Sequence, residues 1–276
     1  MIFLCSCAKS DNKVAATPDS QQNSTYTGFP ALQEIKFSVP DDAGLPNEKM
    51  EHAYGIAKNS KPHQISVDSE KFFEENKFKA ITYDTKSTEK VMYLTFDCGY
   101  ENGNTEKILD VLKQKNVKAA FFCTLHDIKS SPKIIARMIK EGHIVGNHST
   151  THPSFAEIDR AKMVSEIEEC ENYLRKNFGY SSKFFRFPKG EYTQTALDVV
   201  GKLGYTSVFW SLSYADWDTE NQKGADYALK TVTSRFHPGA IILLHAVSSD
   251  NAEAMGQIID SARKSGYQFK SLDESE

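Results

Sequence analysis

The sequence predicts an α/β protein built as a distorted (β/α) barrel of about seven strands, with an irregular N-terminal flank. Short apolar runs alternate with segments whose apolar residues recur three or four positions apart, the spacing of an amphipathic helix. Several helical segments end at a glycine that the next apolar run follows at once, as in KEGH, NFGY, KLGY and KSGY. Repeated strand–helix units of this kind indicate parallel strands joined by right-handed crossovers.

The expected elements share one pattern after residue 90. Each strand is an apolar run too short for a helix, and each helix brings apolar residues such as Ile108, Leu109 and Leu112 onto one face. The expected strands are Val91–Asp97, Ala119–Thr124, His143–His148, Phe184–Pro188, Thr206–Leu212, Ala240–His245 and Phe269–Leu272. The expected helices are Thr105–Lys115, Pro132–Lys140, Ala161–Phe178, Thr195–Leu203, Asp226–Phe236 and Ala252–Lys264.

The chain divides into three parts by composition. Residues 1–30 are rich in Ser, Thr, Asn and Gln with few aromatics, which is typical of a flexible tether. Residues 31–89 have little periodicity apart from the amphipathic segment DSEKFFEENKFKAI, and we expect them to form a flank packed on the barrel. Residues 90–276 carry the regular strand–helix pattern and form the main domain.

The first residues, MIFLCSC, contain Leu4-Cys5-Ser6-Cys7, which resembles a bacterial lipobox whose last cysteine is lipidated. The basic region and the long apolar core of a signal peptide are missing. Two interpretations stay open, a clipped lipoprotein signal and a chance resemblance. The polar tether that follows favours the first, which predicts a lipid anchor through Cys7.

Composition and charge exclude several classes of protein. The 276 residues are 39% hydrophobic and 25% charged, as in ordinary globular proteins that bury a sizeable core. A net charge of −4 supplies no basic field for nucleic acid, and no apolar stretch approaches the roughly 18 residues of a spanning helix. The five cysteines are scattered and do not suggest a disulfide framework; Cys123 and Cys170 are expected to be small buried hydrophobes.

Polar side chains occur where the apolar runs end. The first, third and sixth runs end at Asp97, His148 and His245. Arg186 lies in the fourth run, and Asp216 follows the fifth. Because the C-terminal ends of parallel strands meet at one face of a barrel, we expect these side chains to lie together. A single aspartate after a strand means little, but this many coincidences at one end indicate a site.

His148 and His152, in HSTTHP, are four residues apart. Imidazoles at this spacing can share one divalent ion, although histidine pairs also cap loops. The expected arrival of Asp97 at the same place favours the metal interpretation. A catalytic zinc ion keeps an open position for water and lowers the pKa of that water to near 7.

The other polar residues suit hydrolysis of an amide. Asp97 is the natural general base, and Arg186 a partner that holds it ionised, with a plain salt bridge at the barrel rim as the alternative. His245 is the natural general acid for a leaving amine. Asp216 would hold the imidazole of that histidine charged and oriented.

The motifs TFDCGYENG, HSTTHP, RFPKG, DW and LLH occur in the order and approximate spacing of the five motifs of NodB-type polysaccharide deacetylases, carbohydrate esterase family four. The resemblance extends from Lys90 to Asp273. FDCGYENG, NQKG, DNAEAM and HAYGIAKNSKPHQ resemble the subgroup of muramic acid deacetylases that precede δ-lactam formation in spore-cortex peptidoglycan.

The resemblance implies roles for individual residues. Asp97 would be the general base, His245 the general acid, and His148 and His152 metal ligands. Arg186 would pair with the base, and Asp216 would tune the acid. The backbone N–H at Lys189 would belong to an oxyanion hole, and Trp217 and Leu243 would wall the acetyl pocket.

Cys98 departs from the usual family pattern, which has a metal-binding aspartate at this position. The muramic acid subgroup also lacks that aspartate, so the departure fits the subgroup. A thiolate is a good zinc ligand, and we expect Cys98 to complete a His₂Cys site. In the alternative, Cys98 points away, and two histidines with water hold a weakly bound ion. Phe187 and Lys189 also differ from the residues of other branches, which concerns the substrate groove.

The resemblance implies metal-dependent de-N-acetylation of N-acetylmuramic acid in peptidoglycan, leading to muramic δ-lactam in spore cortex. The cofactor would be a divalent ion, zinc before others. The alternatives are a general peptidoglycan N-acetylglucosamine deacetylase and a non-catalytic binder of wall glycans, which the complete acid–base set disfavours. We expect peptidoglycan strands as the partner, no nucleic acid, and a monomer. The location would be outside the cytoplasm, on the cell wall or spore cortex side of the membrane.

Overall fold

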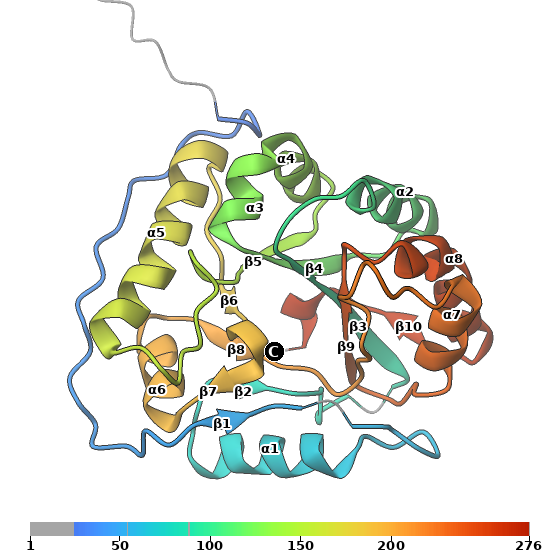
Figure 1. Cartoon of the computed structure of the whole chain (residues 1–276), viewed down its shortest axis with the longest axis horizontal. Helices are drawn as coiled ribbons and strands as arrows, with labels where there is room; N and C mark the ends of the chain where they lie inside the picture. Colours follow the sequence, from blue (N-terminus) through green and yellow to red (C-terminus); the bar gives the residue numbers. More distant parts are fainter. Residues whose placement is uncertain (1–24, 54, 88, 276) are drawn as a thin grey trace, which may run out of the picture.

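A curled parallel sheet occupies the centre of the molecule (Figure 1). The computed structural model describes residues 25–53, 55–87 and 89–275, so the predicted lipobox and most of the tether lie outside the described residues. Within the sheet the strand order is β10-β3-β4-β5-β6-β8-β2, and β9 pairs with β3. The strands are β2 (Ala80–Ile81), β3 (Val91–Cys98), β4 (Ala119–Cys123), β5 (Ile144–Asn147), β6 (Phe184–Phe185), β8 (Thr206–Val208), β9 (Ala240–His245) and β10 (Gln268–Phe269).

The segment after β8 joins the sheet to β9 and curls it into a distorted barrel. The N–H of Ser211 donates to the carbonyl of Ile241 at 3.0 Å, and the N–H of Leu243 donates to the carbonyl of Leu212 at 2.9 Å. The predicted barrel is confirmed, although several strands are shorter than expected. The expected strand Phe184–Pro188 stops at Phe185, because Pro188 begins the 3₁₀ turn η1 (Pro188–Gly190).

Helices surround the sheet on its outer side (Figure 1). They are α2 (Thr105–Lys115), α3 (Leu125–Ser130), α4 (Pro132–Lys140), α5 (Arg160–Phe178), α6 (Gln194–Lys202), α7 (Ala225–Thr233) and α8 (Ser249–Lys264). The bounds of α2 and α4 agree with the prediction, whereas α3 was missed because one short helical turn gives no periodicity to detect. Among the described residues, no helix has both the length and the apolar character needed to cross a bilayer.

The N-terminal flank contacts the barrel in two places. Residues 25–40 form a strap along the outer side of α5 (Figure 1). There the N–H of Ile35 donates to Asn172 Oδ1, and Asn172 Nδ2 donates to the carbonyl of Ile35, both at 2.8 Å. Farther along, β1 (Met50–Glu51) pairs antiparallel with β7 (Glu191–Tyr192), directly after η1. The helix α1 (Gln64–Glu75) then leads to the edge strand β2.

Strand β3 separates two hydrophobic clusters by its side-chain alternation. Tyr93 belongs to the cluster that also contains Leu243. Phe96 and Cys98 belong to a second cluster, which includes helix residues such as Ile258. Because successive side chains of a strand point to opposite faces, residues 97 and 98 end up on different sides of the sheet.

Candidate active site

A cavity of about 610 Å³ opens where the C-terminal ends of the strands meet. Seven of the ten predicted site residues line this cavity, and two more lie directly behind it. The predicted residues that line the cavity are Asp97, His148, His152, Lys189, Trp217, Leu243 and His245. Arg186 and Asp216 are buried behind two of these residues. Cys98 is absent from the cavity wall.

Asp97 is held by a fully buried arginine. Arg186 Nη1 donates to Asp97 Oδ1 at 2.8 Å, and its Nε and Nη2 donate to the carbonyls of Val208 and Phe209 at 2.9 and 3.1 Å. Burial alone would raise the pKa of Asp97, but the charges of Arg186 and the neighbouring histidines lower it below its ordinary value. The carboxylate therefore stays ionised and can accept a proton.

His148 and His152 lie with their ring centroids 4.9 Å apart. His148 Nδ1 lies 2.8 Å from the carbonyl of Arg186, so this nitrogen carries the hydrogen, and Nε2 lies 3.6 Å from Asp97 Oδ2. Burial lowers the pKa of both imidazoles, that of His152 to about 4. Both rings are neutral at pH 7 and keep a lone pair, which is the form that binds a metal.

The loop that carries the two histidines is braced by Glu166 of α5. Its carboxylate accepts from the N–H groups of Thr150 and Thr151 at 3.0 and 2.7 Å. His152 itself has a left-handed backbone, with φ 58°, and its N–H donates to Ser149 Oγ at 3.0 Å. The bend turns the second imidazole back toward the first. The donor types, the fixed tautomer and the braced loop all fit a divalent ion.

Cys98 requires a correction. The last residue of β3 is Cys98, one position beyond the expected end of the strand. Its side chain therefore points to the opposite face of the sheet from that of Asp97 and lies among the buried residues between sheet and helices. Its neighbours there are Cys123 and Asp127, whereas the histidines are on the other side of the sheet. The expected His₂Cys site is wrong, and the alternative in which this thiol points away is the one observed.

His245 and Asp216 form the second charged pair of the cavity. Asp216 Oδ1 lies 2.7 Å from His245 Nδ1, and Asp216 Oδ2 accepts the backbone N–H of His245 at 2.8 Å. Asn251 Nδ2 donates to the same Oδ2 at 2.6 Å. Burial alone would lower the pKa of His245, but the charge and the hydrogen bond of Asp216 have the larger combined effect, and the pKa is raised. The ring can therefore act as an acid through Nε2. The Trp217 ring lies beside it, with a centroid distance of 5.8 Å.

Lys189 lies in a strained turn beside the cavity. Its backbone is left-handed, with φ 60° and ψ 3°, and Gly190 follows with φ 69°. A side chain at Gly190 would come within 2.9 Å of the carbonyl oxygen of His52 and of the Trp210 ring. The N–H of His52 donates to the carbonyl of Gly190 at 2.9 Å, so the flank holds this turn in place.

Sequence reasoning missed two residues of the site. His52 is buried, lines the cavity, and its Nε2 lies 2.7 Å from the carbonyl of Trp210. His52 opens HAYGIAKNSKPHQ, which was noted for its resemblance to the subgroup, but the irregular segment has no periodicity that would give this histidine a role. Asn251 belongs to DNAEAM, which was noted for its resemblance but not given a role, and it orients Asp216.

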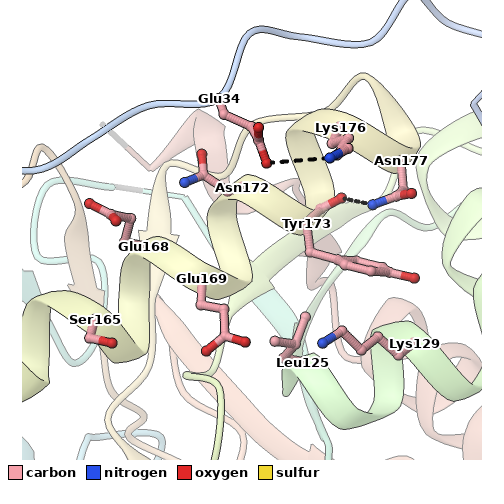
Figure 2. A pocket seen from close by; sticks show the side chains of 10 residues that line it. All are labelled: Glu34, Leu125, Lys129, Ser165, Glu168, Glu169, Asn172, Tyr173, Lys176 and Asn177. Atoms are coloured by element: carbon pink, nitrogen blue, oxygen red, sulfur yellow. Dashed lines mark hydrogen bonds and ion pairs between the residues drawn. The ribbon is translucent and has the colours of Figure 1, made fainter.

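A second cavity, of about 570 Å³, lies on the outer side of α5 (Figure 2). The strap contributes Glu34, whose carboxylate lies 3.8 Å from Lys176 Nζ, and α3 contributes Lys129. Lys129 Nζ sits over the Tyr173 ring, 5.2 Å from its centroid. None of the predicted site residues lines this cavity.

Comparison with known proteins shows which family the chain resembles. The polysaccharide deacetylase family model matches residues 84–208. The chain is 40% identical over 231 residues to the peptidoglycan-N-acetylmuramic acid deacetylase PdaA of Bacillus subtilis, covering 83% of this chain and 87% of that protein. It is 34% identical over 183 residues to a peptidoglycan-N-acetylglucosamine deacetylase of Bacillus cereus, covering 65% and 66%. The solved structure of B. subtilis PdaA, a family 4 carbohydrate esterase, has a TM-score of 0.79 and 40% identity, covering 83% of this chain and 97% of that one.

Proposed function

The chain belongs to the polysaccharide deacetylase family, whose deacetylases are in general metal-dependent, and we propose that it removes the acetyl group from N-acetylmuramic acid in peptidoglycan. One observation supports this above others. The cavity holds a base pair, Asp97 with Arg186, and an acid pair, His245 with Asp216, on either side of two neutral histidines. A binder of wall glycans would have no need of two oppositely tuned groups.

His148 and His152 would hold the divalent ion, for which zinc is our first choice. When bound, the ion activates the attacking water and polarises the acetyl carbonyl. Asp97 accepts a proton from the attacking water, and Arg186 keeps this carboxylate ionised until then. The water oxygen joins the acetyl carbon, the C–N bond breaks, and acetate leaves.

His245 donates a proton to the departing nitrogen, so that the sugar leaves as an amine. Asp216 keeps the imidazole protonated and fixes its Nδ1, which directs Nε2 to the leaving group. The backbone N–H of Lys189 would stabilise the oxyanion from the strained turn. Leu243 and Trp217 would enclose the methyl of the acetyl group.

A second candidate is the removal of acetyl groups from N-acetylglucosamine in peptidoglycan. The relative from Bacillus cereus carries this name, and the same acid–base set would serve either sugar. The muramic acid assignment rests on the more extensive similarity to PdaA. We place the protein outside the cytoplasm, where its substrate is, as a monomer. A lipid anchor through Cys7 and a role in forming cortex δ-lactam complete the proposal.

The test is mass spectrometry of muropeptides before and after incubation with the purified protein and Zn²⁺. One peptidoglycan sample keeps its peptides, and a second is treated with an amidase to expose muramic acid. We expect loss of an acetyl group from muramic acid on the amidase-treated glycan, with a further loss of water if the lactam closes. Loss from glucosamine on the untreated glycan would establish the second candidate. No loss with any divalent metal, while the glycan still binds, would contradict both.

A further inference from the structure

Two thiols and a carboxylate meet on the outer side of the sheet, behind the active site. They belong to Cys98 at the end of β3, Cys123 at the end of β4, and Asp127 in α3. The two sulfurs and a carboxylate oxygen all lie within 4.8 Å of one another. All three residues are buried, with exposed fractions of 2%, 0% and 5%.

The fold brings these three side chains together through the backbone. Cys98 and Cys123 are register partners in neighbouring parallel strands, so their side chains share one face. Thr124 follows at once, and its N–H donates to the carbonyl of Cys98 at 3.0 Å. The hydroxyl of Thr124 caps α3 by accepting the N–H of Asp127 at 3.3 Å. The cluster is therefore fixed by the strand ends and by a helix cap.

The donor set is that of a thiophilic divalent ion. Zinc binds thiolate sulfur at about 2.3 Å and carboxylate oxygen at about 2.0–2.2 Å, which places its ligand atoms roughly 3.5–3.8 Å apart. The observed separations, all below 4.8 Å, need only small side-chain rotations to reach this arrangement. Two sulfurs in the set disfavour magnesium and calcium, which take oxygen ligands.

The carboxylate of Asp127 lacks a compensating cation. In the described part of the chain it forms no ion pair with lysine or arginine, and the nearby Cys123 thiol and His126 only partly offset its burial. Glu101 adds a second negative charge nearby, and burial together with Glu101 raises the pKa of Asp127 to about 6. A buried carboxyl beside two thiols, without a lysine or arginine partner among the described residues, is unfavourable in an apolar core. A bound cation would remove that cost.

We propose that Cys98, Cys123 and Asp127 form a second metal site, separate from the histidine site and selective for a zinc-like ion. Both thiols lose their protons to solvent on binding, and two thiolates with one carboxylate coordinate the ion. This site is structural: it ties the ends of β3 and β4 to α3 on the side opposite the cavity. The inference does not depend on the proposed function.

The experiment adds Co²⁺ to the reduced, full-length protein without oxygen and records its absorption spectrum. The background is the double variant His148→Ala/His152→Ala, which removes the predicted active-site ligands. We expect a thiolate-to-cobalt charge-transfer band, uptake of about one metal ion per chain, and a rise in the melting temperature. Zn²⁺ should displace the cobalt and abolish the band.

Variants of single cysteines in the same background identify the ligands. Cys98→Ser and Cys123→Ser should each lose the charge-transfer band and the rise in melting temperature. The matched control is Cys170→Ser, because Cys170 is equally buried, in the same cluster, yet is not one of the three grouped residues. Its variant should keep both signals. Circular dichroism of every metal-free variant shows whether it folds, and a misfolded serine variant is replaced by the corresponding alanine variant.

Three results would overturn the proposal. The first is no charge-transfer band in the folded double variant. The second is a band that survives both Cys98→Ser and Cys123→Ser, which would assign the binding to other cysteines of the chain. The third is a cross-link between Cys98 and Cys123 in protein purified under air, detected by mass spectrometry, together with no cobalt binding after its reduction. That outcome would make the pair a disulfide site.

Discussion

Two largely buried carboxyl groups lie near the C-terminal end of β3, one on each side of the sheet, and their pKa values are shifted in opposite directions: Asp97 belongs to β3 and Asp127 to α3. On the cavity side, burial of Asp97 is outweighed by Arg186, and its pKa is lowered. On the helix side, Asp127 is buried among thiols, and its pKa is raised to about 6. Both side chains are largely buried, so burial alone does not decide in which direction the pKa of each carboxyl group is shifted. The difference lies in the cation at hydrogen-bond distance, which Asp97 has in Arg186.

This contrast shows how the alternation of a strand places adjacent residues in different surroundings. Asp97 and Cys98 are adjacent in sequence, yet one reaches the acid–base cavity and the other a packed layer. The cavity side supplies its own cation through Arg186, which favours the ionised form of Asp97, the proposed base. Among the described residues the helix side supplies no lysine or arginine to Asp127, and in the second metal site proposed above an ion would take that place. The predictions below test each side in turn.

The largest expected effect follows removal of the proposed base, Asp97. Asp97→Asn keeps the shape of the side chain but cannot accept a proton, and we expect kcat to fall by about 10²–10⁴-fold. The matched control on the other side of the sheet is Asp127→Asn, which should change kcat by far less. Acetate release measured on both variants decides the point. Equal losses of kcat in the two variants would contradict the claim that only the carboxylate on the cavity side takes part in the reaction.

Replacing the buried cation should destabilise the fold. Arg186→Met leaves Asp97 ionised and buried with no partner, so we expect the free energy of unfolding to fall by about 3–5 kcal/mol. Urea denaturation of the metal-free protein measures this. The double variant Arg186→Met/Asp97→Asn should recover part of the loss, because it removes the uncompensated charge. If the double variant is no more stable than the single one, the carboxylate is not the cause.

The acid pair predicts a pH effect. Asp216 raises the pKa of His245, so the protonated acid persists to higher pH and activity is lost as pH rises through that pKa. Asp216→Asn removes the charge, and the alkaline limb of the kcat profile should move to lower pH, with a loss of about 10–100-fold at neutral pH. The shape of the pH profile is the measurement. A uniform loss without a shift of the limb would show a merely structural role.

The smallest expected effect concerns the turn held by the flank. Gly190→Ala forces a side chain against the carbonyl of His52 and against Trp210 at a positive φ, which should cost roughly 1–3 kcal/mol of stability and lower kcat. Gly204→Ala is the control: its φ is 94°, but no atom lies within 4 Å of the added carbon. Thermal unfolding and kcat of both variants separate close contact from backbone strain. A loss of kcat in both alike would exclude a role for the contact with the flank.

Much of the architecture could be predicted, because the helix and strand periods are local. Asp97, His148 and His245 end apolar runs, and the parallel barrel brings strand ends together, so their meeting follows from topology. Cys98 could not be placed, because one extra residue of strand reverses the direction of a side chain. His52 could not be found either, because its place depends on the long-range pairing of β1 with β7.

Mass spectrometry of amidase-treated muropeptides, with wild-type protein and the Asp97→Asn variant side by side in Zn²⁺, tests the central claim most directly. We predict that wild-type protein removes an acetyl group from muramic acid and that the folded variant does so at least about 100-fold more slowly. Equal acetyl loss with the two proteins would contradict the assignment of Asp97 as the base. No acetyl loss with folded, metal-loaded wild-type protein would contradict the deacetylation itself.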